Sequence, residues 1–183
     1  GTYIAAAAAA GGEITLNNYY EKDMRAVEAK FRQCGVSIMH HGSSATIRSD
    51  GHLCAAKRIE THPFPGFPTD MQAQMLALAA MAKGTSVVVE NVFENRFAHA
   101  GDLNRMGANV LVNGRTAVVQ GVDMLYGTHV TARDLRGGAA LVIAGLAARG
   151  ETLVERAELI HRGYERLEEM LGALGAEIRR DSV

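Results

Sequence analysis

The sequence predicts a fold of the α/β class, built as a threefold repeat. An apolar, Ala-rich stretch ends in a glycine three times, at Gly12, Gly84 and Gly150. Each of these glycines precedes a short run of residues typical of a β-strand. A second set of glycines follows 23, 23 and 25 residues later, at Gly35, Gly107 and Gly175. A glycine at both places suits the left-handed backbone that forms where a helix ends and a strand follows.

We therefore expect each unit to contain a helix, a strand, a second helix and further strands. The first strands are expected at 13–16, 85–89 and 151–154, and later ones at 45–48, 117–120 and 177–180. The units occupy about residues 1–60, 61–125 and 126–183 of a single domain. The third unit stops soon after 177–180, so its last strand is either not needed or supplied by another segment or chain.

The first helix of each unit is apolar on almost every side. These helices are expected at 4–10, 75–82 and 141–148. A helix that is apolar all round is buried all round, which favours three central helices surrounded by sheets. A central sheet flanked by helices is the other arrangement that fits the pattern. The second helices, such as 164–174, carry charged faces and are expected at the surface.

The composition argues against several classes of function. The 183 residues carry 19 basic and 20 acidic side chains, so no positive field favours nucleic acid or an anionic membrane as a partner. No apolar run reaches the roughly 18 residues that span a bilayer. Cys34 and Cys54 lack the spacing of a disulfide framework or of a zinc site. We expect a cytoplasmic protein.

Asp70 follows a stretch, residues 62–68, that contains all three prolines of the chain. Because proline fixes the backbone, this stretch is expected to be extended and stiff, and so to aim Asp70. The carboxylate lies at or next to the start of the helix 71–82, where free N–H groups and the helix dipole stabilise a negative charge. The alternative is that Asp70, or Thr69, only caps this helix.

Arg96 lies in a loop directly after the strand expected at 85–89. Loops at the ends of strands commonly carry ligand-binding groups in α/β folds, which makes Arg96 a candidate for binding an anion. The alternative is that Arg96 pairs with Glu94 or Asp102 at the surface.

Arg136 and Arg166 are further candidates for binding an anion. Arg136 follows Asp134, which is suited to capping the third buried helix, and two glycines come next. The start of a helix favours anions, and the glycines let a ligand approach closely. Arg166 lies on a charged segment where Glu165 and Glu169 are alternative partners. The residues by themselves point to an anion site made of one aimed aspartate and several arginines.

Five segments resemble the UDP-N-acetylglucosamine enolpyruvyl transferases, in the same order and at matching spacing. They are FPTDMQAQ at 67–74, VFENRF at 92–97, RMGA at 105–108, DLR at 134–136 and RGYE at 162–165. The resemblance covers essentially the whole chain and implies the second, C-terminal domain of such an enzyme. It implies an inside-out α/β barrel of three repeats, with buried helices surrounded by sheets. In the family, the final strands of this domain come from the N-terminus of the enzyme.

The resemblance also implies a reaction. The enolpyruvyl group would pass from phosphoenolpyruvate to the 3-hydroxyl of UDP-N-acetylglucosamine, as in the first committed step of peptidoglycan synthesis, without a metal or an organic cofactor. Asp70 would contact that hydroxyl and transfer its proton, and Val92 would contact the UDP-sugar through its backbone. The remaining site residues, Arg96, Arg136 and Arg166, would surround the phosphate and carboxylate of phosphoenolpyruvate.

Part of the family's active site has no counterpart in this sequence. The catalytic Cys of the family and a phosphoenolpyruvate-binding Lys belong to the other domain, and neither Cys34 nor Cys54 matches that Cys. The implied partner is the N-terminal half of the enzyme, and we expect the chain alone to be inactive or nearly so. An unpaired sheet edge could also form a homo-oligomer. A non-catalytic module that binds a UDP-sugar or a protein is the alternative from another class.

Overall fold

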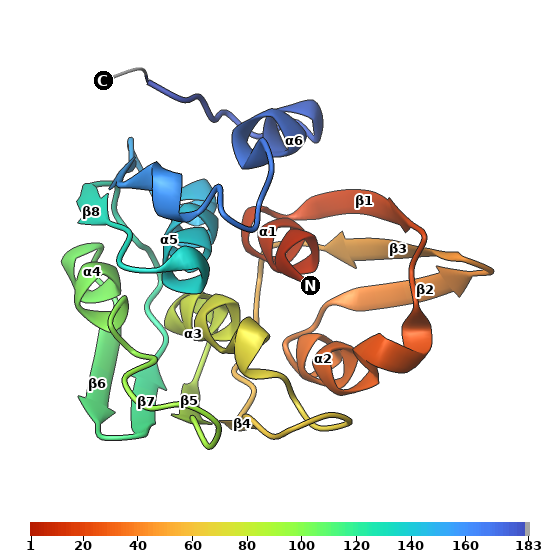
Figure 1. Cartoon of the computed structure of the whole chain (residues 1–183), viewed down its shortest axis with the longest axis horizontal. Helices are drawn as coiled ribbons and strands as arrows, with labels where there is room; N and C mark the ends of the chain where they lie inside the picture. Colours follow the sequence, from red (N-terminus) through yellow and green to blue (C-terminus); the bar gives the residue numbers. More distant parts are fainter. Residues whose placement is uncertain (182–183) are drawn as a thin grey trace.

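Three buried helices form the centre of the molecule, as Figure 1 shows. The computed structural model describes residues 1–181. Its helices are α1 (Thr2–Ala10), α2 (Glu21–Gln33), α3 (Gln72–Met81), α4 (Ala100–Arg105), α5 (Leu135–Ala147) and α6 (Leu167–Ala173), with 3-10 helices η1 (Thr69–Met71) and η2 (Ala157–Leu159). Its strands are β1 (Gly12–Asn17), β2 (Ser37–His41), β3 (Ser44–Ser49), β4 (Arg58–Glu60), β5 (Thr85–Val89), β6 (Asn109–Asn113), β7 (Thr116–Gln120), β8 (His129–Thr131) and β9 (Leu153–Glu155). None of the helices in this part of the chain is both long and apolar enough to cross a membrane.

The central helices are α1, α3 and α5, which pack against one another. Ile4, Leu76 and Leu141 are fully buried, as are most of the alanines around them. Because alanine and glycine side chains are so small, the helices approach one another closely without a sheet between them. The prediction of buried helices surrounded by sheets is therefore confirmed, and the alternative with a central sheet is wrong.

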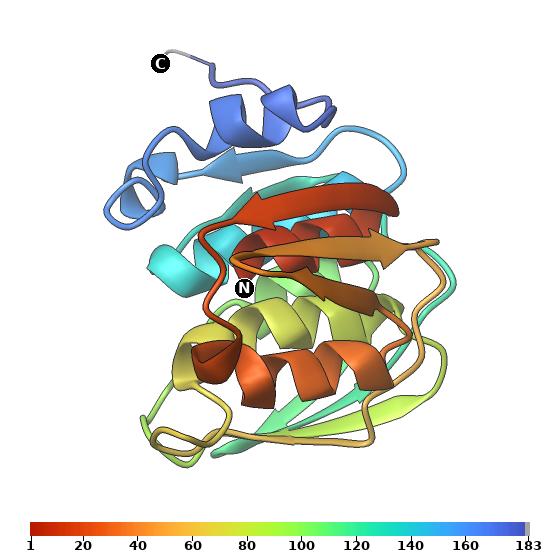
Figure 2. The same ribbon diagram turned by 90° about the vertical axis from the view of Figure 1, so that its right-hand side faces the viewer.

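Three sheets surround the central helices (Figures 1 and 2). The first sheet is antiparallel, with the strand order β1-β3-β2. The second has the order β4-β5-β7-β6, in which β4 runs parallel to β5 and the other pairs are antiparallel. The third contains only the parallel pair β8 and β9. The second sheet therefore has four strands, whereas the first has three and the third has two.

The predicted strand at 177–180 is wrong, because these residues form no strand. In the second sheet, the outer strand β6 pairs with β7, and β7 in turn pairs with β5. Within residues 1–181, β9 has no antiparallel neighbour that could play the part of β7. Without that neighbour, a strand at 177–180 has no ladder of hydrogen bonds to join.

The last helix begins later than predicted, at Leu167 instead of Tyr164. Arg166, directly before it, has a left-handed backbone with φ 50°, which cannot belong to a right-handed helix. The Tyr164 hydroxyl lies 2.8 Å from Thr2 Oγ1 on α1. A contact with a distant helix therefore decides the conformation of residues that look helical by their charge pattern.

Candidate active site

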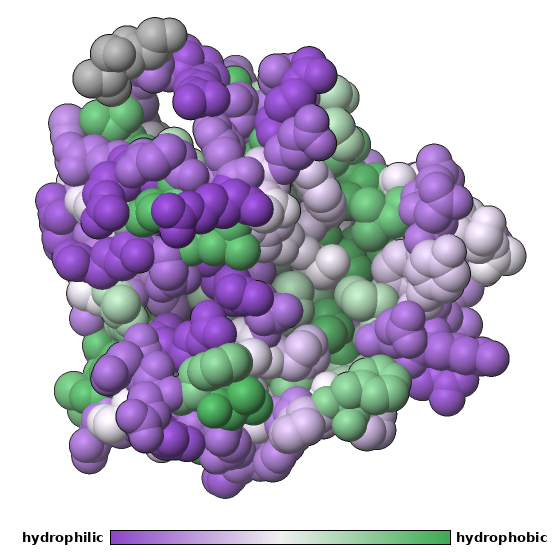
Figure 3. Space-filling view, viewed as in Figure 1, coloured by the Kyte–Doolittle hydropathy of each residue, from purple (hydrophilic) through white to green (hydrophobic). Residues whose placement is uncertain are grey.

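All three central helices begin on the same side of the molecule, the left-hand side in Figure 2. We call this side the N-terminal face and define it by the first residues of the helices, Thr2, Gln72 and Leu135. The positive ends of three helix dipoles point to this face, which favours a bound anion. Figure 3 looks onto this face and shows hydrophilic side chains gathered over α4 and α5, with a paler surface around α1.

Asp70 lies in η1, directly before α3, and its carboxylate is not used as a helix cap. Instead, Asp70 Oδ1 lies 2.6 Å from the Arg136 guanidinium at the start of α5. The side chains of Asp70 and Arg136 are 62% and 30% exposed, so both remain open to a ligand. The fold thus brings together two predicted site residues that are 66 positions apart in the sequence.

The start of α5 is built by Asp134, as expected. Its Oδ1 accepts hydrogen bonds from the backbone N–H groups of Arg136 at 2.9 Å and Gly137 at 2.8 Å. A β-carbon at Gly138 would lie 2.6 Å from the Ile160 side chain, so only glycine fits at this position. The cap and the glycine fix the first turn of α5, which carries Arg136.

Arg96 lies over the ring of Phe93, with its guanidinium carbon 4.4 Å from the ring centre. The two carboxylates considered as its partners are occupied by others: Glu94 pairs with Arg115, and Asp102 is bonded elsewhere. Among residues 1–181, Arg96 forms no ion pair. A cation–π contact positions the guanidinium without neutralising its charge, which leaves Arg96 available for an anion.

Arg166 is not brought into contact with the other predicted residues. It precedes α6, is 68% exposed and pairs with Glu169. The bond to Glu169 raises the pKa of Arg166 above its ordinary value. The alternative of a charged, solvated surface therefore describes Arg166 well in this structure.

Sequence reasoning gave no role in the site to Arg162, four residues earlier. The neighbouring Gly163 packs against Leu135, since a β-carbon there would lie 3.0 Å from the leucine side chain. Arg162 therefore lies next to the start of α5 in the fold. Among the described residues it forms no ion pair. Its place directly before the glycine in the RGYE segment was the available signal.

A buried polar network fixes the segment that carries Arg162. The Tyr164 hydroxyl lies 2.8 Å from Thr2 Oγ1 and accepts a hydrogen bond from Gln74 Nε2 at 3.3 Å. Gln74 Nε2 also donates to Thr2 Oγ1 at 3.1 Å. The network joins the third unit to α1 and α3 at the N-terminal face, so the positions of all three units there depend on one another.

Glu90 is the second residue that sequence reasoning overlooked. It follows the last residue of β5, is only 1% exposed, and accepts a hydrogen bond from the backbone N–H of Val92 at 2.9 Å. Glu90 also accepts a hydrogen bond from the hydroxyl of Thr69, the neighbour of Asp70. Its position directly after a β-run could have suggested a role, but nothing in the sequence indicates its partners.

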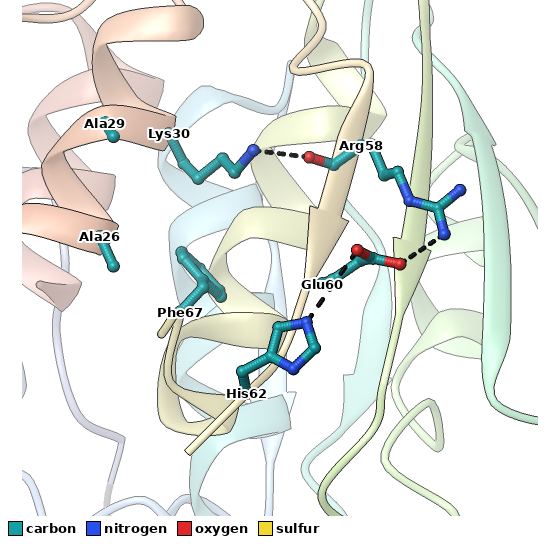
Figure 4. Close-up of a pocket in the computed structure, with 7 residues that line it drawn as sticks. All are labelled: Ala26, Ala29, Lys30, Arg58, Glu60, His62 and Phe67. Atoms are coloured by element: carbon teal, nitrogen blue, oxygen red, sulfur yellow. Dashed lines mark hydrogen bonds and ion pairs between the residues drawn. The ribbon is translucent and has the colours of Figure 1, made fainter. Parts of the chain in front are cut away.

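A separate hollow lies between α2 and β4, away from these residues (Figure 4). Its volume is about 360 Å³, and seven residues line it: Ala26, Ala29, Lys30, Arg58, Glu60, His62 and Phe67. Lys30 Nζ donates to the Arg58 carbonyl at 2.7 Å, and Arg58 pairs with Glu60. The charged groups satisfy one another, so we do not assign the hollow to the candidate site.

Comparison with protein families decides what this arrangement belongs to. The family model described as EPSP synthase (3-phosphoshikimate 1-carboxyvinyltransferase) matches residues 1–171. The chain belongs to the EPSP synthase family. Within the family, it is similar to proteins named UDP-N-acetylglucosamine 1-carboxyvinyltransferase. The relative from Caldanaerobacter subterraneus subsp. tengcongensis is 49% identical over 98% of this chain, and the relative from Caulobacter vibrioides is 51% identical over 98%.

This member of the EPSP synthase family spans less than half the length of those two relatives, 43% and 42%. It covers 74% of a further relative, from Desulfofundulus thermocisternus, at 49% identity. Among solved structures, the enolpyruvyl transferase NikO from Streptomyces tendae matches with a TM-score of 0.83 and 28% identity, over 97% of this chain and 42% of NikO. An EPSP synthase from Acinetobacter baumannii matches with a TM-score of 0.76 and 25% identity, over 99% of this chain and 43% of that one. Both likenesses support the fold of buried helices surrounded by sheets.

Proposed function

We propose that the chain forms one part of an enzyme that transfers the enolpyruvyl group of phosphoenolpyruvate to the 3-hydroxyl of UDP-N-acetylglucosamine. The names of its relatives, at about half identity over nearly the whole chain, support this substrate pair. We place the reaction in the cytoplasm, as the first committed step of peptidoglycan synthesis, with its links to cell shape and division. No metal or organic cofactor takes part in this proposal.

The observation that carries the proposal is the contact between Asp70 and Arg136 at the N-terminal face. It places a carboxylate, which accepts a proton, beside a guanidinium, which binds phosphate or carboxylate. A base and an anion-binding group close together suit a reaction between an alcohol and an anionic enol phosphate. The positive ends of the helix dipoles around them add to the attraction for the anion.

The proposed chemistry assigns a role to each predicted residue. Asp70 accepts the proton of the sugar 3-hydroxyl as its oxygen bonds to C2 of phosphoenolpyruvate, while an acid on the other part of the enzyme, in the place of the family's catalytic Cys, donates a proton to C3. The bond between C2 and the phosphate oxygen then breaks, the departing phosphate takes up the hydroxyl proton from Asp70, and C3 returns its added proton to the acid. Inorganic phosphate and the enolpyruvyl ether are the products. The backbone of Val92 contacts the UDP-sugar, and Arg96 and Arg136 hold the phosphate and carboxylate of phosphoenolpyruvate.

The third positive charge comes from the segment 162–166. The family resemblance assigns it to Arg166. The packing of Gly163 on Leu135 places its neighbour Arg162 next to the start of α5 and favours Arg162 instead. Mutation of each arginine separates the two assignments, as described in the Discussion.

The proposed partner is the remaining part of such an enzyme, and the third sheet offers a place for it. A groove of about 1770 Å³ runs along α5 and β9 to residues 175–181. Val142, Leu146 and Leu153 contribute apolar surface to it. A strand added antiparallel to β9 would repeat the pairing of β7 with β5 in the second sheet. We propose that the partner supplies this strand, and that a second copy of the chain is a weaker occupant of the same edge.

Phosphate release from phosphoenolpyruvate and UDP-N-acetylglucosamine tests the proposal. The chain is assayed alone and in a chimera, in which it replaces the matching part of the Caldanaerobacter relative. The unaltered relative serves as the positive control. We expect no release by the chain alone, release by the chimera, and loss of release in the chimera with Asp70→Asn.

A folded chimera that binds UDP-N-acetylglucosamine but releases no phosphate would contradict the enzymatic proposal. That outcome would favour a non-catalytic module that binds a UDP-sugar. Release by the isolated chain would contradict the proposal that the site needs a second part.

A further inference from the structure

A buried carboxylate connects the two segments that carry most of the predicted site residues. Glu90 Oε1 accepts hydrogen bonds from Thr61 Oγ1 at 2.8 Å and from the backbone N–H groups of Val92 at 2.9 Å and Phe93 at 3.0 Å. Glu90 Oε2 accepts a hydrogen bond from Thr69 Oγ1 at 2.9 Å. One side chain therefore holds the end of β4, the η1 turn and the loop 92–96 together.

Glu90 keeps its negative charge without a cationic partner. In residues 1–181, no Lys, Arg or His forms an ion pair with it. Burial raises the pKa of this carboxyl group, but the bonds from Phe93, Thr61, Val92 and Thr69 outweigh burial and lower the pKa below its ordinary value. Hydrogen bonds from these donors offset the cost of burying the charge. Each donor is thereby held in one place relative to the others.

The donors to Glu90 lead to the candidate site. Thr69 directly precedes Asp70, and Val92 is itself a predicted contact of the sugar nucleotide. Phe93 carries Arg96 on its ring at 4.4 Å. A change in the position of Glu90 would therefore displace the proposed base and the proposed anion-binding loop relative to each other.

We propose that Glu90 is a positioning residue, which sets the distance between Asp70 and the loop 92–96 through its bonds to Thr69, Val92 and Phe93. It does not touch a substrate in this proposal. Its effect on turnover rests on the proposed function, while its effect on the loops does not. Displacement of reacting groups by about 1 Å commonly lowers turnover about 100-fold, so a positioning residue has a large effect without contact.

Amide hydrogen exchange of the isolated chain tests the effect on the loops. In Glu90→Ala, the amides of Val92 and Phe93 lose their acceptor, and we expect their exchange to speed up about tenfold or more. In Glu90→Gln, the Oε1 atom still accepts three bonds, and the new Nε2 donates to the Thr69 hydroxyl. We therefore expect exchange in Glu90→Gln to stay within about threefold of the original chain.

Kinetics of the chimera test the effect on turnover. Thr69→Val removes only the bond between Glu90 and the turn that carries Asp70. We expect kcat to fall about tenfold or more, with the Val92 and Phe93 amides still protected and with KM for phosphoenolpyruvate little changed. Thr69→Ser keeps a hydroxyl and should restore most of kcat. As a control, Ser49→Ala removes a buried hydroxyl that donates to the Ala8 carbonyl at 3.2 Å and accepts from the Gly51 N–H at 3.1 Å, near the opposite end of α1. This change should leave kcat unchanged.

The two readouts separate failure of this inference from failure of the proposed function. Unchanged exchange in folded Glu90→Ala would overturn the inference, whatever the activity. An active chimera in which Thr69→Val keeps its kcat would also overturn it. If the original chimera is inactive, the proposed function fails, and the exchange of Val92 and Phe93 still decides whether Glu90 orders the loop. Should Glu90→Ala not fold, the kcat of Thr69→Val compared with that of Thr69→Ser in the chimera tests the inference.

Discussion

The Arg136 guanidinium lies 2.6 Å from the Asp70 carboxylate, across the starts of α5 and α3. Neither helix by itself would make a site, because the two groups belong to different units of the repeat. In the proposed reaction, the phosphate or carboxylate of phosphoenolpyruvate binds the Arg136 guanidinium in place of Asp70. Asp70 can then accept the hydroxyl proton. The first prediction follows from this exchange of partners.

Mutation of Asp70 and Arg136 should affect different kinetic constants of the chimera. Asp70→Asn removes the proposed base, and we expect kcat to fall about 100-fold or more. Arg136→Ala removes a charged contact with the anion, and we expect KM for phosphoenolpyruvate to rise about 10- to 100-fold. Because the ion pair is partly exposed, each change should alter the free energy of unfolding by about 1 kcal/mol or less. Equal kcat in Asp70→Asn and the original would contradict the assigned role.

Arg162 and Arg166 should differ in their effect on substrate binding. Arg162 lies beside the start of α5, whereas Arg166 pairs with Glu169 at the surface. We expect Arg162→Ala to raise KM for phosphoenolpyruvate about tenfold or more, and Arg166→Ala to have a smaller effect. Glu169→Ala is the control for loss of the surface pair. A larger effect of Arg166→Ala would restore the assignment that the sequence suggested.

Gly138 should tolerate no side chain. A β-carbon there would lie 2.6 Å from Ile160 Cγ1 and 2.9 Å from Ala132 Cβ. We expect Gly138→Ala to lower the free energy of unfolding by about 1–3 kcal/mol. The matched control is Gly172→Ala in α6, where nothing lies within 4 Å of the added carbon. That substitution should stabilise the chain by about 0.5–1 kcal/mol. Urea unfolding measures both, and similar values for the two would contradict the packing described.

The free energy of unfolding should decrease as the pH is lowered, because of His99. This side chain is 1% exposed and has no hydrogen-bond partner among the described residues. Burial lowers the pKa of His99 from 6.5 to about 4, although Asp134 and Asp102 act in the opposite direction. Between these pH values the unfolded chain binds a proton at His99 and the folded chain does not. Folding is therefore favoured above pH 6.5, and this advantage is lost as the pH falls towards 4.

His99→Phe should remove this pH dependence, because a phenyl ring takes the place of the imidazole and the titrating group is lost. Between pH 7.5 and pH 5, we expect the original chain to lose about 2 kcal/mol more stability than the variant. Urea unfolding at the two pH values gives the comparison. Parallel losses in both proteins would show that other groups cause the change.

The sequence determined the interior of the fold through a local property. Helices that are apolar on every side must be buried on every side, so α1, α3 and α5 were predicted at the centre. The cap of α5 by Asp134 was predictable for the same reason, since the carboxylate and the N–H groups it binds are neighbours in the chain.

The tertiary structure alone decided what depends on distant partners. A strand at 177–180 needs a neighbouring strand, which the described chain does not supply. Asp70 was expected to cap a helix or to be aimed at a ligand, and only the packing of α3 on α5 brought it to Arg136. The partners of Glu90 come from three separate segments. The hydrophobic pattern follows from the order of the residues in the chain, whereas hydrogen bonds and ion pairs between units depend on how the units pack.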